Sequence, residues 1–191
     1  MAFLVVPYAA STVLFSRIAQ STPDVVWSEQ KRIILGVILM IPLIPRAESG
    51  WIFAIPLLIT GTGIGFLVSQ LNNYTLSPIS EERVSEAAGV NSASGSFGLS
   101  FGLAFAGAIM LGALALSFTN MSQASTVLTP AQQDQVAVAL EEDAQIMSDT
   151  QLQAQLAGQP PEIQEEILAI NSEARSFALQ VALLVPLVAA L

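Results

Sequence analysis

The chain has 191 residues, of which 53% are hydrophobic and 11% are charged, whereas about 25% of the residues in an ordinary soluble domain are charged. Six basic residues against 15 acidic ones give a net charge of −9, so no basic surface is expected that could bind nucleic acid. The chain contains neither cysteine nor histidine, which excludes disulfides, thiol or imidazole catalysis and the usual zinc ligands. We therefore expect a membrane protein rather than an enzyme, with no cofactor and no metal.

Five segments contain no Asp, Glu, Lys or Arg: 1–16, 33–45, 51–73, 87–118 and 176–191. All charged residues of the chain lie between these segments. Because one charged side chain at the centre of a bilayer costs roughly 2.5–3.5 kcal/mol on insertion scales, this separation is typical of helices in lipid. The sequence predicts an all-α integral membrane protein with about five transmembrane helices, which form a partial helical bundle in a cell membrane.

The first and last segments are shorter than the roughly 20 residues that cross a bilayer, so we expect the chain to be a fragment that begins and ends inside a helix. Segment 33–45 is also short, and Lys31, Arg32 and Arg46 are expected to reach the interface from its ends. Basic residues are more numerous in loops 17–32 and 74–86 than in the alternate loops. This asymmetry predicts an N-terminus outside and a C-terminus inside.

Segment 51–73 contains the run Gly61-Thr62-Gly63-Ile64-Gly65. On a helix, Gly61, Gly65 and Asn72 share one face, whereas Gly63 and Gln70 lie nearly opposite. A Gly-x-x-x-Gly face lets two membrane helices approach closely. We therefore predict that Gly61 and Gly65 are helix-packing residues.

Segment 87–118 repeats this pattern, because Asn91, Gly95, Gly98 and Gly102 also share one helical face. One interpretation is tight packing of this face against another helix. The other is a sliding surface beside a solute pathway. The polar residues that would offer hydrogen bonds to cargo in that pathway are Gln70, Asn72, Asn91 and Ser94.

No acidic residue lies within the five uncharged segments, although a proton-driven transporter needs a titrating group inside the membrane. The nearest carboxylate is Glu86, beside Glu81, Glu82 and Arg83 before segment 87–118. We interpret this cluster as a loop anchor rather than a proton site. A coupling carboxylate is expected in another part of the intact protein.

Residues 119–175 form a long polar insertion with nine acidic residues and the single cation Arg175. Thr129 followed by Pro130 and Gln132 predicts a helix start, with Val136, Leu140 and Met147 as its apolar stripe. Gly158 predicts a helix end, and Pro160-Pro161 predicts the start of a second helix that continues into segment 176–191. Two interpretations stay open, an outer cap that selects solutes and a solvated helical hairpin without such a role.

Two features give the chain a family resemblance. One is the glycine run from Gly61 to Gly65, which a short inner loop follows. The other is residues 82–91, Glu-Arg-Val-Ser-Glu-Ala-Ala-Gly-Val-Asn, leading into Phe-Gly-Leu-Ser-Phe-Gly-Leu-Ala at 97–104. With the long outer loop before the final helix, these features resemble the C-terminal part of a major facilitator superfamily transporter, in the fourteen-helix drug:proton antiporter branch.

The resemblance implies proton-coupled efflux of small molecules across a cell membrane, a bacterial inner membrane in particular. It implies a small-molecule substrate, a proton and a missing N-terminal transmembrane half as partners, so the fragment alone is expected to be inactive. The alternative hypothesis is a non-transporting membrane scaffold or assembly subunit that binds partner helices through its Gly-x-x-x-Gly faces.

Overall fold

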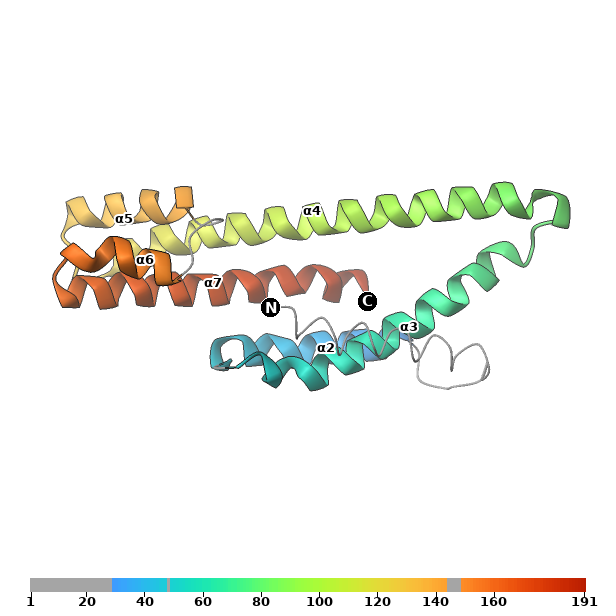
Figure 1. The fold of residues 1–191 in the computed structure, drawn as a ribbon, viewed down its shortest axis with the longest axis horizontal. Helices are drawn as coiled ribbons and strands as arrows, with labels where there is room; N and C mark the ends of the chain where they lie inside the picture. Colours follow the sequence, from blue (N-terminus) through green and yellow to red (C-terminus); the bar gives the residue numbers. More distant parts are fainter. Residues whose placement is uncertain (1–28, 48, 144–148) are drawn as a thin grey trace. The chain divides into compact units, whose positions relative to one another are not determined.

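The computed structural model describes residues 29–47, 49–143 and 149–191. All regular structure in these ranges is helical, without strands, as the sequence predicted (Figure 1). The predicted first segment, 1–16, lies outside the described residues. Among the described residues, three helical stretches are long and apolar enough to cross a membrane, namely Gly50–Val68, Glu81–Ala124 and Pro161–Ala189.

The chain divides into two compact units. The first contains the described residues up to Ala104 together with Leu183–Leu191, and the second is Phe105–Ala182. The predicted arrangement was four membrane helices over 1–118, a separate loop over 119–175 and a last helix over 176–191. This division concerns the membrane and stays a prediction. In the structure, helices continue through both ends of residues 119–175.

In the first unit, helix α2, Glu29–Met40, continues as the 3-10 helix η1, Ile41–Arg46. The α-helix ends there because Pro42 and Pro45 lack the N–H that the α-helical pattern requires and their rings clash with the preceding turn. Predicted segment 33–45 therefore falls within α2 and η1. Helix α2 itself has 12 residues, which are too few to cross a bilayer without η1.

Helix α3, Ala54–Leu76, follows the short η2, Gly50–Phe53, and packs beside α2 (Figure 1). The two helices come very close at Gly36, where an added Cβ would overlap the Thr60 hydroxyl and lie 2.8 Å from the Pro56 carbonyl oxygen. The Thr60 hydroxyl in turn donates to that carbonyl at 2.9 Å. A glycine is thus required at position 36 for this packing distance.

A second contact between α2 and α3 joins Arg32 and Phe66. The Arg32 guanidinium carbon lies 4.6 Å from the centroid of the Phe66 ring, and Phe66 is buried. A cation over an aromatic face is attracted by the negative potential of the ring. Arg32 thus has an aromatic partner inside the protein in addition to its predicted place near the interface.

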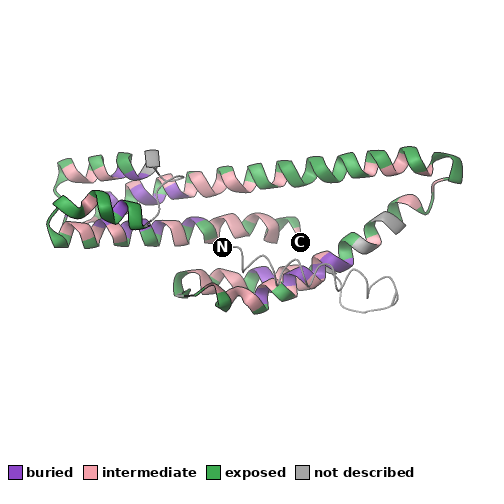
Figure 2. Cartoon of the chain, in the orientation of Figure 1, coloured by how far each residue is buried: buried purple, intermediate pink, exposed green. Residues whose placement is uncertain are grey.

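Helix α4, Val84–Ala124, has 41 residues, which corresponds to about 60 Å at 1.5 Å per residue. The predicted segment 87–118 lies within it. From Ser85 to Phe105 the helix is mostly exposed, as Figure 2 shows. Its exposed side chains there include large apolar ones, among them Phe97, Leu99 and Leu103, each at least 71% exposed. Such a surface is suited to lipid or to another helix rather than to water.

The second unit has a hydrophobic core built from the end of α4, the start of α7 and two short helices, α5, Pro130–Asp143, and α6, Asp149–Gln155. Figure 1 shows α5 and α6 lying along these parts of α4 and α7. The buried residues of this core are Leu114, Phe118, Leu128, Leu140, Leu152, Ile167, Ile170, Ala174 and Ala178. Most of the predicted polar loop is therefore part of a packed helical unit, in which both flanking helices take part.

The start of α5 agrees with the prediction. Its first residue is Pro130, and the Gln132 side-chain oxygen accepts hydrogen bonds from the Thr129 N–H at 2.9 Å and from the Thr129 hydroxyl at 2.7 Å. This is half of a capping box, because the residue three positions after the cap satisfies the N–H of the cap residue. Of the predicted stripe, Leu140 is buried and Val136 is partly buried, whereas Met147 lies outside the described residues.

Helix α7, Pro161–Ala189, begins at the predicted proline and runs without a break through most of predicted segment 176–191. The short 3-10 helix η4, Leu156–Gly158, precedes it and ends at the predicted stop. The polar first half of α7 therefore belongs to the same helix as its uncharged second half. The prediction that one helix joins the polar insertion to the last apolar segment is confirmed.

Candidate functional site

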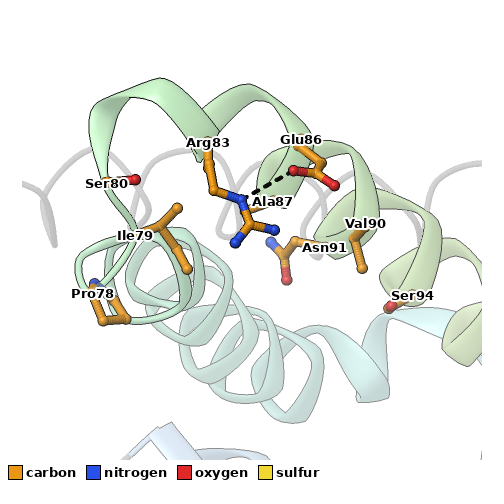
Figure 3. A pocket seen from close by; sticks show the side chains of 9 residues that line it. All are labelled: Pro78, Ile79, Ser80, Arg83, Glu86, Ala87, Val90, Asn91 and Ser94. Carbon is orange, nitrogen blue, oxygen red and sulfur yellow. Dashed lines mark hydrogen bonds and ion pairs between the residues drawn. The ribbon is translucent and has the colours of Figure 1, made fainter.

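The candidate site is a cleft of about 620 Å³ at the beginning of α4, within the first unit. The turn after α3 forms one side of it, and the first turns of α4 form the other (Figure 3). The residues that line it are Pro78, Ile79, Ser80, Arg83, Glu86, Ala87, Val90, Asn91 and Ser94. The cleft thus combines charged and polar groups from a loop and a helix that is long and apolar enough to span a membrane.

The charged part of the cleft is an ion pair between Arg83 and Glu86. The Arg83 Nε donates to a Glu86 carboxylate oxygen at 3.3 Å, and both side chains are largely exposed. Arg83 ends the 3-10 helix η3, Glu81–Arg83, and Glu86 lies in the first turn of α4, so the two residues are three apart and face the same side. Such an exposed pair contributes about 0–1 kcal/mol, so the pair can open at low cost.

The polar part of the cleft contains two of the four predicted pathway residues. Asn91 and Ser94 both line the cleft, about one helical turn apart on α4. In Figure 3, Asn91 lies beside the Arg83–Glu86 pair, and Ser94 lies further along α4, past Val90. An amide, a hydroxyl and an ion pair together offer hydrogen-bond donors and acceptors. This arrangement can bind a polar or charged group of a solute reversibly.

The other two predicted pathway residues belong to α3. Gln70 is partly buried and is not among the residues that line the cleft. The side chain of Asn72 lies outside the described part of the chain. The structure therefore brings Asn91 and Ser94 together and does not add Gln70 to them.

The predicted packing glycines have two different surroundings. Gly61 and Gly65 are buried on α3, and so is Gly63, which helical geometry places on the opposite face. On α4, a Cβ added at Gly95, Gly98 or Gly102 would meet no atom of the described residues within 4 Å. Packing of another helix against the α4 glycines stays a prediction.

The sequence interpretation missed the glycine that makes the close helix contact in the first unit, Gly36. The signal for it was weak, because Gly36 is the only glycine between 33 and 45 and no second small residue follows at four positions. Its partner Thr60 directly precedes the glycine run of α3. A single glycine among large aliphatic residues can therefore mark a helix crossing without a Gly-x-x-x-Gly pattern.

Within the described ranges, no group of three or more acidic residues is arranged to hold a metal ion. Comparisons of the chain with protein-family models, with curated proteins and with solved structures found no match.

Proposed function

We propose that this chain is part of a membrane transporter, in which the Asn91–Ser94 side of α4 lines the path of a small solute. The observation that carries the proposal is the cleft in which Asn91 and Ser94 lie together with the Arg83–Glu86 pair. These polar groups lie at the start of a helix whose next residues are uncharged and exposed. A solute entering an apolar helix bundle from water needs such polar contacts at its entrance.

The resemblance to the drug:proton antiporters supports a finer assignment. It favours proton-coupled efflux of small molecules through a secondary transporter in a cell membrane, a bacterial inner membrane in particular. In such proteins two groups of helices move against each other around a site near the middle of the membrane. Five helices with the N-terminus outside and the C-terminus inside would form part of one group, and a proton-binding carboxylate would lie in the other part of the protein.

The Arg83–Glu86 pair is suited to a role at the mouth of the proposed path. Because the pair is exposed, water screens it and little free energy is needed to separate the two side chains. A charged solute could therefore exchange its own contact for the one between Arg83 and Glu86. This gives the cleft a way to bind solutes without holding them tightly.

Labelling of single cysteines tests the path directly, because the chain contains no cysteine. Ser94→Cys places a thiol in the cleft, and Ser96→Cys is a matched control at nearly the same depth, roughly 200° around the helix. In intact membranes, we expect a membrane-impermeant maleimide to label position 94 several times faster than position 96. Equal labelling of both positions, or protection of both, would contradict an aqueous path along this side of α4.

The second candidate function is a membrane scaffold, and the open surroundings of Gly95, Gly98 and Gly102 favour it. Small residues with free space above them allow a partner helix to approach. Gly98→Leu separates the two functions in an intact protein that contains this chain. Loss of transport with normal insertion and assembly supports the path, whereas loss of assembly supports the scaffold.

A further inference from the structure

A second cavity lies within the second unit, between α4 and α7. Its volume is about 380 Å³. Residues of both helices line it: Gly107, Met110, Leu111, Leu114, Arg175, Ala178 and Leu179. The lining is apolar except for one guanidinium. This combination fits a ligand with an apolar body and one anionic group.

The guanidinium of Arg175 is held in place by a buried neighbour. Its Nε donates to the Asn171 side-chain oxygen at 3.0 Å, and Asn171 is only 2% exposed. A guanidinium carries five N–H donors in a planar, rigid fork. When a neighbour fixes the plane of that fork, the group is well prepared to bind phosphate or carboxylate oxygens in pairs.

The position of Arg175 along α7 indicates where the anionic group would lie. Arg175 is the last charged residue of the chain, and residues 176–191 are uncharged. If α7 crosses a membrane, as its length and composition allow, Arg175 lies at the boundary between water and lipid. The apolar residues of the cavity, such as Met110 and Leu179, are then suited to a hydrocarbon chain.

Arg175 is the one group of segment 119–175 whose charge is opposite to that of an anionic ligand. Residues 119–175 contain nine acidic residues and no other cation, so an anion approaching this unit is repelled by most of the segment and attracted at this position. We propose that the cavity binds an anionic phospholipid, with the lipid phosphate on Arg175 and an acyl chain along α4 and α7. This proposal requires α7 to enter the membrane, and it does not depend on transport.

Native mass spectrometry of the full chain in detergent tests the proposal, with added phosphatidylglycerol, phosphatidylcholine or inorganic phosphate as probes. We expect one phosphatidylglycerol to stay bound in preference to phosphatidylcholine. Arg175→Gln removes the charge and should weaken this binding at least about tenfold. Arg46→Gln, which removes an exposed cation of the first unit outside both cavities, should leave it unchanged.

A pair of glycine variants tests the cavity without touching the charge. A Cβ at Gly107 or at Gly112 has no neighbour within 4 Å in the described part of the chain, but only Gly107 lines the cavity. Gly107→Leu should therefore fill the space and weaken lipid binding, whereas Gly112→Leu should not. This pair keeps the proposal testable if Arg175→Gln does not fold, which circular dichroism would reveal.

Three results would overturn the proposal. They are equal binding of the two lipids by the unmodified chain, unchanged phosphatidylglycerol binding in both Arg175→Gln and Gly107→Leu, and displacement of the lipid by inorganic phosphate at similar concentration. Displacement by inorganic phosphate would mean that the site at Arg175 binds a free anion rather than a lipid. Failure of Ser94→Cys to label, by contrast, bears on transport alone.

Discussion

Gly36 on α2 lies so close to Thr60 on α3 that a Cβ at position 36 would overlap the Thr60 hydroxyl. The Thr60 backbone nitrogen would lie 2.9 Å from the same Cβ, so rotation of the Thr60 side chain alone cannot make room. The contact joins two helices of the first unit that pack on each other. It therefore offers a sharp test of that packing.

We expect Gly36→Ala to destabilise the packing of α2 on α3 by about 1–3 kcal/mol, the usual cost of overpacking. Unfolding of the chain in detergent, followed by circular dichroism, measures this change. Gly89→Ala is the control, because a Cβ at Gly89 meets none of the described atoms within 4 Å and alanine favours a helix by about 0.5–1 kcal/mol. Equal effects of the two substitutions would contradict the close contact at Gly36.

The contact between Arg32 and Phe66 predicts a coupling between these two side chains. A double-mutant cycle with Arg32→Gln and Phe66→Leu should give a coupling free energy of about 0.5–2 kcal/mol, as expected for a cation over an aromatic ring. The measurement is the unfolding free energy of the two single variants and the double variant. Additive effects would mean that the two side chains do not interact.

The cap of α5 predicts that the Gln132 side chain stabilises the first turn of this helix. Gln132→Ala removes the acceptor for the Thr129 N–H and hydroxyl, which should cost about 0.5–2 kcal/mol. Gln135→Ala, at an exposed position on the same helix, should change stability much less. Hydrogen exchange at the first turn of α5 reports the effect, and equal exchange in the two variants would argue against the cap.

The Ser122 hydroxyl is fully buried and has no hydrogen-bond partner among the residues that the structure describes. A buried hydroxyl without a partner costs about 1–3 kcal/mol in desolvation. Ser122→Ala should therefore leave the stability of the second unit unchanged or raise it, as the unfolding midpoint would record. A clear loss of stability would show that the hydroxyl has a partner.

The local signals in the sequence were sufficient to predict individual helix ends. Thr129, Pro130 and Gln132 predicted the start of α5, and Pro161 predicted the start of α7, because caps and prolines act on the nearest turn. The spacing of Ile163, Ile167 and Ile170 also indicates an apolar face. None of these signals identifies what that face packs against.

The contacts between helices required the structure. Ile167 and Ile170 belong to a core with Leu114 and Phe118, but the latter two lie in a segment that is uncharged throughout and so has no polar face to mark the buried side. The cleft at the start of α4 was not predicted, although two of the residues that line it, Asn91 and Ser94, were named as pathway residues. From the sequence, Arg83 and Glu86 were interpreted as part of a loop anchor. Residue spacing alone cannot show that the loop before α4 lies beside a face of that helix.

The central claim is that the uncharged helices lie in a lipid bilayer, and washing of membranes with alkaline carbonate tests it most directly. The chain should remain in the membrane pellet after the wash and require detergent for extraction. Recovery of the chain as a monomer in detergent-free supernatant would contradict the claim, and the proposed lipid site and solute path would fail with it.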